Sequence, residues 1–483
     1  MTLSKDLQSR QEVRDLVEAA HRAEIILRQF PQSKIDKIVE AMALAGKTHA
    51  SELAEMARKE TGFGIVADKT EKNRFASETL WENIKDLPTV GILNRDDKRR
   101  VWDIGVPVGV IAAIIPSTNP TATVIYKAMI SLKAGNSIVF SPHPGAKACI
   151  RKAAQIMADA AEKAGCPRGA VGCISEPSMD AVDELMKHPK VKLILATGGN
   201  AMVRSAYSSG KPAIGVGAGN GPAYLCSDCD LKQAVADIVR SKTFDNGTVC
   251  ASEQSIVVER SFSAEAEAEL KRQGCCMLEE TDAKRLAAFL FRENGTMNPR
   301  IVGKPASEIA QLAGLSTEAR QARVLIAREN GVGKAFPYSM EKLCPVLGYY
   351  VVDDQEGALN RICEVLEHEG SGHTCTIHTK DEDVVRRFAA KVPVSRFLVN
   401  TPAALGGIGA TTGLFPALTL GCGAVGGSSS SNNIGPLDLI NIRRVAWGTA
   451  QKDRSTAPEQ QVTELDDELI EMLTQKLLDR IMK

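Results

Sequence analysis

The sequence lacks an excess of charge of either sign. Its 483 residues include 59 Lys and Arg and 59 Asp and Glu, which gives a formal net charge of zero. Phosphate backbones are bound by a basic excess or a basic stripe, so this balance argues against nucleic acid as the main partner. The densest basic stretches, Arg99-Arg100 and 320–328, are better explained as solvated faces.

Long apolar runs and a secretory segment are missing as well. The N-terminus passes straight into a charged helical pattern without an apolar core, so we expect no signal peptide. The longest apolar run, Ile104 to Pro116, is 13 residues long and is interrupted by Gly105, Pro107 and Gly109, which is too short to cross a bilayer. We therefore expect a cytoplasmic protein with no membrane contact.

The sequence also has little that would bind a metal ion. Its 12 cysteines indicate reduced thiols rather than a disulfide framework in a chain of this kind. Cys226 and Cys229 form one C-x-x-C pair, but neither a second pair nor a His pair follows at zinc spacing. We expect no metal site.

The composition that is present, 24% charged and 44% apolar, is typical of a soluble enzyme, and the length favours two or three domains. Helical periodicity marks Gln11 to Ala45, 51–59 and 69–85. Short buried strands then alternate with helices, which predicts an α/β fold with a doubly wound parallel sheet. The expected strands are 111–115, 137–140, 171–174 and 191–196, and the expected helices are 121–133, 146–165, 179–188 and 200–208.

A second α/β unit follows a glycine-dense stretch, Ala213 to Tyr224, which is interpreted as a crossing between domains. The Gly-, Ser- and Thr-rich stretch 404–435 is interpreted as a close-packed loop that lines a cleft. Expected strands of this unit are 256–258, 323–327, 348–352 and 373–378, and expected helices are 231–241, 264–274, 303–313, 317–322, 355–367 and 381–391.

Two segments carry candidate chemistry. Cys250 follows the turn signal Asn246-Gly247 and precedes the apolar run 255–258, a pattern that predicts a thiol at the mouth of a cleft; a cysteine packed as a small hydrophobe is the alternative. Thr197-Gly198-Gly199 ends a strand before a helix, where glycines let the backbone approach a phosphate. That spacing is not the G-x-G-x-x-G fingerprint, so a structural loop is the alternative.

Phe244-Asp245-Asn246-Gly247-Thr248-Val249-Cys250 resembles the nucleophile segment of the aldehyde dehydrogenase superfamily. The stretches 115–120 and 341–346 are similar to that family's Pro-Trp-Asn and Glu-x-Phe-x-Pro-Val segments, with Leu343 in place of Phe. The resemblance implies a Rossmann-like cofactor domain, an α/β catalytic domain and a β-arm for oligomerisation. The implied boundaries are 1–219 for the cofactor domain with its arm at 96–107, 220–423 for the catalytic domain and 424–448 for a return segment.

The resemblance also implies residue roles. Cys250 would be the nucleophile, and Asn119 would donate its amide to the developing oxyanion. His373 is a candidate base for the thiol, with a structural histidine as the alternative. The residues implied to contact the nicotinamide cofactor are Pro116, Ser141, Thr197, Gly198, Gly199 and Glu341, the last of these gripping the nicotinamide ribose.

Departures from the hydrolytic members favour the CoA-acylating branch. Val216 stands where hydrolytic members carry the glutamate that activates water, and Ser141 and Pro144 replace their adenosine-ribose pair. The implied activity is oxidation of a small aldehyde, such as acetaldehyde or propionaldehyde, to acyl-CoA with NAD, or with NADP, by a homodimer or homotetramer. The alternatives are a hydrolytic dehydrogenase, a non-catalytic shell-associated protein and a glutamyl-phosphate reductase.

A polar stretch, 449–463, is interpreted as a linker to an amphipathic helix over 464–483, whose leucines recur four residues apart. The helix either packs on its own oligomer or docks another protein. Similar tails on acylating dehydrogenases direct them into bacterial microcompartments, so a shell protein is the partner, and a microcompartment the location, that the resemblance implies.

Overall fold

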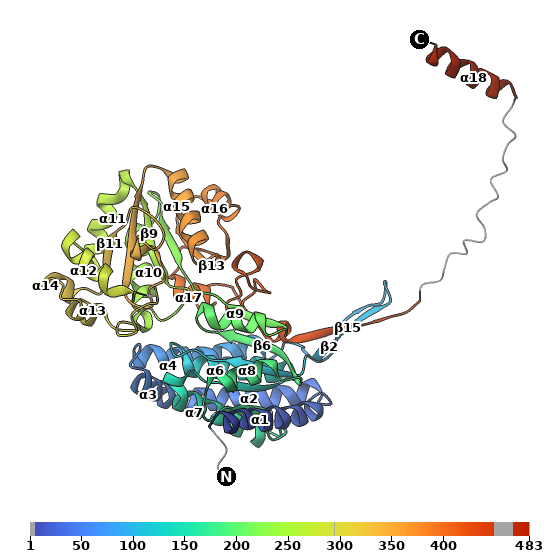
Figure 1. Cartoon of the computed structure of the whole chain (residues 1–483), viewed down its shortest axis with the longest axis horizontal. Helices are drawn as coiled ribbons and strands as arrows, with labels where there is room; N and C mark the ends of the chain where they lie inside the picture. The colour runs from blue at the N-terminus through green and yellow to red at the C-terminus, as the bar shows by residue number, and fades with distance from the viewer. Residues whose placement is uncertain (1–4, 294, 449–466, 483) are drawn as a thin grey trace.

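The computed structural model describes residues 5–293, 295–448 and 467–482. Two parallel sheets form its body, and a three-stranded arm projects from one side (Figure 1). The first sheet has the order β5-β4-β3-β6-β7, with every neighbouring pair parallel. Its strands are β3 (Val110–Ile114), β4 (Ser137–Ser141), β5 (Val171–Cys173), β6 (Val191–Thr197) and β7 (Ala213–Val216).

Helices cover both faces of this sheet because alternate side chains of each strand point to opposite faces. Val110 and Ala112 pack in one core cluster, whereas Ile111 and Ala113 pack in the other. The first face is covered by α1 (Lys5–Leu27), α8 (Met179–Lys187) and α9 (Asn200–Ser208), and the second by α2 (Gln32–Thr48), α6 (Pro120–Lys133) and α7 (Lys147–Lys163). The expected strands and helices of this unit are confirmed to within a few residues.

The helical periodicity over Gln11 to Ala45 corresponds to two helices. Pro31, which has no N–H to donate, precedes the first residue of α2 and separates it from α1. The rest of the helical N-terminal block consists of α3 (Ala50–Thr61), α4 (Val66–Arg74), a π-helical turn (Phe75–Thr79) and α5 (Leu80–Ile84).

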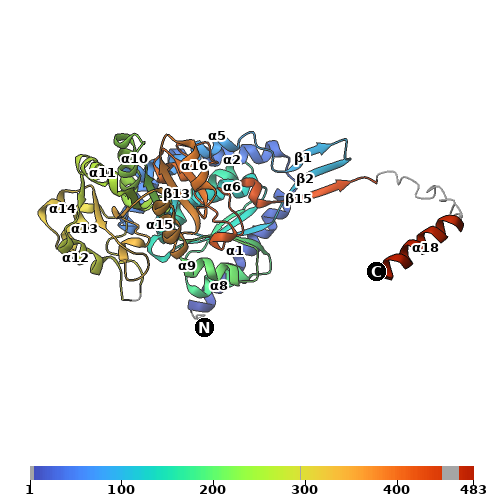
Figure 2. The same cartoon turned by 90° about the horizontal axis from the view of Figure 1, so that it is seen from above.

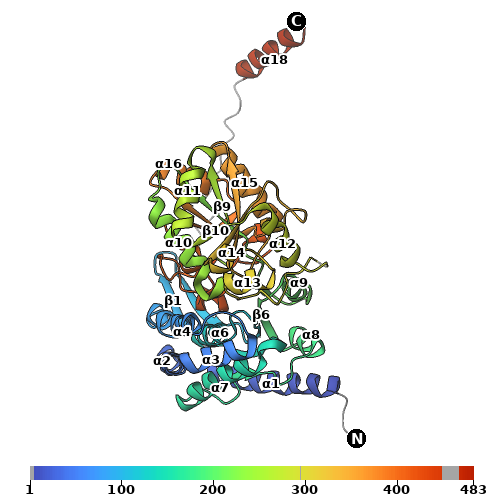
Figure 3. The ribbon, with the colours of Figure 1, turned by 90° about the vertical axis from the view of Figure 1, so that its left-hand side faces the viewer.

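The second sheet has seven parallel strands in the order β10-β11-β12-β9-β8-β13-β14. The unit built on it lies against the unit built on the first sheet (Figure 3). Its strands are β8 (Gly221–Leu225), β9 (Glu253–Glu259), β10 (Cys275–Met277), β11 (Val324–Arg328), β12 (Val346–Val352), β13 (Gly372–His378) and β14 (Val394–Val399). Its helices are α10 (Leu231–Thr243), α11 (Arg260–Arg272), α12 (Glu280–Leu290), α13 (Ala306–Leu312), α14 (Thr317–Gln321), α15 (Gln355–His368), α16 (Glu382–Ala389) and α17 (Ala403–Gly407).

The glycine-dense stretch Ala213 to Tyr224 is not a loop throughout. It contains β7 of the first sheet and most of β8 of the second, so the crossing is confined to Gly217–Asn220. A domain boundary between residues 219 and 220 stays a prediction, and this change of sheet supports it.

The arm is a sheet of β1 (Gly91–Asp96), β2 (Val101–Pro107) and β15 (Ile440–Ala446), all antiparallel. The expected arm, 96–107, contains only the second of these strands in full. Trp102 and Trp447 pack edge to face with ring centroids 4.8 Å apart, which ties β2 to the end of β15. The arm leaves the body as a narrow projection (Figure 2).

Helix α18 (Asp467–Ile481) stands apart from the body in all three views (Figures 1, 2 and 3). From Ile470 onward its large apolar side chains are exposed, among them Leu473, Leu477 and Ile481. The predicted linker, 449–463, lies outside the described residues. Among the residues that are described, no helix combines the length and apolarity that crossing a membrane requires.

Candidate active site

The carboxyl ends of β3, β4 and β6 bring the expected cofactor residues to one edge of the first sheet. Pro116 follows β3, Ser141 ends β4 and Thr197 ends β6. The Oγ of Ser141 and the Oγ1 of Thr197 are buried without a hydrogen-bond partner, and a side chain at Gly199 would meet no atom within 4 Å. Unpaired hydroxyls beside an open glycine loop fit a nucleotide, which binds outside the carboxyl ends of such strands.

Lys127 lies under this edge, at the point where the strand order reverses. Its Nζ donates to Ile114 O at 3.0 Å and to Leu195 O at 2.9 Å and so joins the ends of β3 and β6. Burial lowers the pKa of Lys127 to about 7. Sequence reasoning missed this residue, because a lysine within an apolar helix gives no signal of the two carbonyls it will meet.

Cys250 lies between the 3-10 turn Phe244–Gly247 and β9, half-buried and with a free thiol. A Cβ on Gly219 would stand 1.8 Å from the Cys250 carbonyl oxygen, so only glycine lets the crossing segment pass this close. Burial, together with the charges of Glu341 and Cys422, raises the pKa of Cys250 to about 12, against the opposing charge of Arg396.

Asn119 is the N-cap residue of α6, and its side chain reaches the nucleophile segment. Its Nδ2 donates to the carbonyl of Thr248, two residues before Cys250, at 3.1 Å. The structure therefore places the amide beside the nucleophile segment, where an oxyanion donor is required. Its catalytic role stays a prediction.

Glu341 is also brought to the cysteine. Its Oε1 accepts from the backbone N–H of Gly219 at 2.9 Å, and its own N–H donates to Glu369 at 2.8 Å. Burial raises the pKa of Glu341 to about 8, and the neighbouring Glu369 raises it as well. The carboxylate thus acts on Cys250, and its predicted contact with the nicotinamide ribose remains a proposal.

His373 is fully buried at the start of β13. Its Nδ1 lies 2.9 Å from Thr374 Oγ1, and its Nε2 has no hydrogen-bond partner. Burial and the charge of Arg396 lower the pKa of His373 to about 3, so the ring is neutral and a weak proton acceptor. Its role as a base stays a prediction that this environment opposes.

Arg396, on β14, is another buried cation that the sequence did not reveal. It donates to the carbonyls of Gly421 at 2.7 Å and Gly372 at 3.2 Å, and its charge acts on both Cys250 and His373. It also lines a hollow together with Phe415, Asn433 and other residues of the 414–438 loops. The cleft-lining interpretation of 404–435 is consistent with this hollow.

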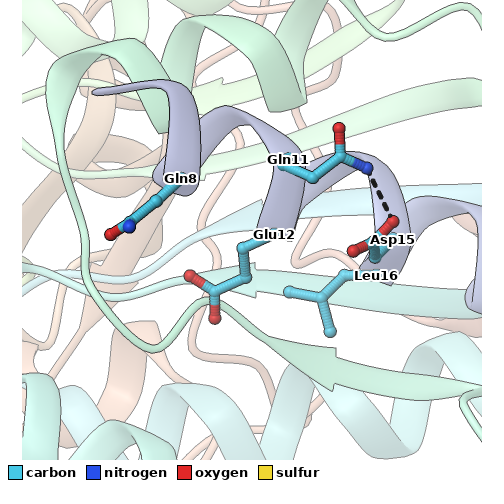
Figure 4. A pocket seen from close by; sticks show the side chains of 5 residues that line it. All are labelled: Gln8, Gln11, Glu12, Asp15 and Leu16. Carbon is cyan, nitrogen blue, oxygen red and sulfur yellow. Dashed lines mark hydrogen bonds between the residues drawn. The ribbon is translucent and has the colours of Figure 1, made fainter. Parts of the chain in front are cut away.

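Val216 ends β7 and is buried, so the position where the resemblance to hydrolytic members predicts a glutamate holds an aliphatic side chain in a packed environment. A second hollow lies along α1, lined by Gln8, Gln11, Glu12, Asp15 and Leu16 (Figure 4). It contains no cysteine and lies on the face of the first sheet that α1 covers. Within the described ranges, no group of three or more His, Cys, Asp or Glu side chains could hold a metal ion.

Fold and site together define a class: a two-sheet parallel α/β protein with a cysteine at the edge where a nucleotide would bind. The aldehyde dehydrogenase family model matches residues 4–274. The chain belongs to the aldehyde dehydrogenase family.

Three relatives in that family are similar to this chain over most of its length. An acetylating aldehyde dehydrogenase of Geobacillus thermoglucosidasius is 50% identical, with a TM-score of 0.91 over 92% of this chain and 99% of that one. The bifunctional aldehyde-alcohol dehydrogenase AdhE of Escherichia coli K12 is 44% identical over 90% of this chain and 49% of its own. The chain thus spans about half the length of this relative.

The third relative is a propionaldehyde dehydrogenase of Rhodopseudomonas palustris, whose structure holds propionyl-CoA. It is 27% identical, with a TM-score of 0.82 over 90% of this chain and 94% of that one.

Proposed function

We propose that this chain is a CoA-acylating aldehyde dehydrogenase. It oxidises a small aldehyde of the acetaldehyde or propionaldehyde type to acyl-CoA with NAD, or with NADP as the alternative. The observation that carries the proposal is the buried Val216 at the end of β7, which leaves no carboxylate at the position that activates water in hydrolytic members. The acetylating and propionyl-CoA-bound relatives support the same reading.

The chemistry uses the chain's own residues as follows. The Cys250 thiolate adds to the aldehyde carbon. The backbone N–H of Cys250 and the side-chain amide of Asn119 stabilise the resulting alkoxide. A bound nicotinamide would supply the hydride acceptor, and loss of hydride from the thiohemiacetal would leave a thioester on Cys250. The CoA thiol then attacks the thioester carbonyl, so that acyl-CoA leaves and the Cys250 thiol is restored. Splitting the reaction into two transfers predicts ping-pong kinetics.

Ser141, Thr197, Gly198 and Gly199 would hold the nicotinamide cofactor, and Pro116 would border it. Their unpaired hydroxyls and the open backbone at Gly199 support this assignment. Glu341 would contact the nicotinamide ribose after turning from its bond with Gly219.

The test is the appearance of reduced nicotinamide at 340 nm with propionaldehyde, measured with and without CoA, alongside Cys250→Ala. We expect turnover that requires CoA, yields propionyl-CoA and is lost in the variant. Equal turnover without CoA, with release of free propionate, would mean that water is activated from elsewhere, and the acylating function would be wrong.

We also propose two interaction surfaces. The antiparallel arm is the element through which the chain forms a homodimer or homotetramer. Helix α18 docks a microcompartment shell protein, which would place the enzyme inside the compartment. Exposed apolar side chains at Leu473, Leu477 and Ile481 support this role, because a helix packed on its own body would bury them.

A further inference from the structure

A buried cluster of charge lies beside the nucleophile segment and takes no part in the chemistry described above. Lys69 and Lys72 come from α4, which contacts the Phe244–Gly247 turn, and both are almost completely buried. Their partner is Asp245 of that turn, also fully buried. In Figure 1, α4 lies at the side of the lower body that faces the seven-stranded sheet.

Asp245 is held in an unfavourable backbone conformation. Its φ is +47°, and that of Asn246 is +52°, in the left-handed region that non-glycine residues seldom adopt. Its carboxylate compensates with several bonds: Ile65 N donates at 2.7 Å, Thr248 Oγ1 at 2.7 Å and Lys69 Nζ at 2.9 Å, and Lys72 Nζ donates as well. Although burial opposes it, the charges of Lys72 and Lys69 hold the pKa of Asp245 below its usual range.

Lys72 also contacts the predicted oxyanion donor. Its Nζ donates to Asn119 Oδ1 and to Asp245 Oδ2, and its third contact is Thr248 Oγ1 at 3.4 Å. An ammonium has three donors and no acceptor, so these contacts use all of them. None of the three is directed at Cys250.

The two ends of the Asn119 amide are thereby distinguished. Only its oxygen can face the lysine, because Lys72 can only donate, and only its nitrogen can face the Thr248 carbonyl, because that oxygen can only accept. One N–H of Nδ2 is bonded to Thr248, and the other is left for the substrate. Without Lys72, only the Thr248 carbonyl would oppose a rotated amide that presents its oxygen to a developing negative charge.

We propose that Lys72 is a positioning residue that orients the Asn119 amide so that its free N–H faces the oxyanion formed on Cys250. Asp245 holds Lys72 in place and balances its charge, and Lys69 donates to the same carboxylate. The inference rests on the proposed function only in requiring a thiohemiacetal on Cys250. It adds a residue of α4, 47 positions before Asn119, to the machinery of the reaction.

The experiment is a double-mutant cycle on Lys72→Met and Asn119→Ala, followed by kcat and KM for reduced nicotinamide formation with propionaldehyde and CoA. Removing one oxyanion donor costs about 10²- to 10³-fold in rate, so we expect Lys72→Met to lower kcat about 10²-fold with KM changed less than about 3-fold. In the Asn119→Ala background, Lys72→Met should lower kcat less than about 3-fold, because the amide that Lys72 orients is absent.

Two controls separate positioning from folding. Lys133→Met removes an equally buried lysine, paired with Asp36 away from the site, and should keep kcat within about 3-fold. The alkylation rate of Cys250 by iodoacetamide should be unchanged in Lys72→Met, because Lys72 donates to Asn119, Asp245 and Thr248 and not to the thiol. Lys72→Met leaves Asp245 paired with Lys69, so no buried charge loses its partner. If this variant does not fold, Lys72→Gln, which keeps an amide donor for Asn119 Oδ1, takes its place and should retain more kcat than Asn119→Ala.

The positioning role would be overturned if Lys72→Met lowered kcat equally in both backgrounds, or if it raised KM and left kcat unchanged. The outcome is separable from the proposed function. A wild-type enzyme that oxidises the aldehyde equally well without CoA would contradict the acylating function, while the cycle, which follows hydride transfer, would still report on Lys72.

Discussion

At the scale of single residues, the site is assembled from partners that lie far apart in the chain. Cys250 and Asn119 could be picked out from the sequence because each sits in a short motif at the end of a predicted strand or turn. Lys72 and Arg396 could not, since nothing near them in sequence signals that they will be buried beside that cysteine. Lys72 meets Asp245 across 173 positions.

The electrostatics of Cys250 give a prediction at the same scale. Its pKa of about 12 means that the thiolate fraction is small and rises with pH, so alkylation by iodoacetamide should speed up about tenfold per pH unit up to about pH 8 and less steeply above it. Glu341, with a pKa of about 8, is charged above that pH and disfavours the thiolate. Glu341→Gln should therefore accelerate alkylation at pH 9 and have little effect at pH 7.

Alkylation rates over this pH range, with Cys250→Ala as the blank, provide the measurement. The Gln side chain keeps an oxygen for the N–H of Gly219, so the comparison isolates the charge. An alkylation rate that is flat with pH would show that a neighbouring group already holds the thiolate, and the account of Cys250 as a desolvated thiol would be contradicted.

At the scale of elements, strands with local signals were predictable, and strands defined by distant pairing were not. β3, β4 and β6 are short, mostly apolar runs, and the sequence located each within a few residues. β7 and β8 were included in the predicted crossing between domains because glycine weakens the strand signal, although both lie in buried sheets. β14 was missed, and β15 is a strand because it pairs with β2, more than 300 residues earlier.

The crossing between β7 and β8 carries the prediction for this scale. Gly219→Ala places a methyl group 1.8 Å from the Cys250 carbonyl oxygen, and that backbone contact cannot be relieved by rotating a side chain. We expect kcat to fall at least about tenfold, because a displacement of the nucleophile of about 1 Å is costly.

Gly199→Ala is the matched control, since a Cβ there meets no atom within 4 Å. It should leave the alkylation rate of Cys250 unchanged, whereas Gly219→Ala should alter it. An unaltered alkylation rate and kcat in Gly219→Ala would show that the two segments do not approach each other this closely in solution.

At the scale of the whole molecule, the body and α18 are separate parts with separate proposed tasks. Deleting 464–483 should leave kcat and KM within about 2-fold, because truncations tolerated by a fold are those that remove no buried contacts. Co-sedimentation with a purified shell protein should be lost.

As a matched control, Leu473→Gln/Leu477→Gln keeps the helix length and removes only exposed apolar side chains. It should reproduce the loss of co-sedimentation. A truncated enzyme that loses activity, or that changes its oligomeric mass, would show that the helix packs within the enzyme, and the docking role would be wrong.

The central claim is that the acyl group rests on Cys250 until CoA removes it. The most direct measurement is the mass of the Cys250 peptide after the protein is incubated with propionaldehyde and NAD in the absence of CoA. We predict a propionyl thioester on Cys250 that persists and then disappears when CoA is added, with formation of propionyl-CoA. An unmodified Cys250 accompanied by accumulating free propionate would contradict the account.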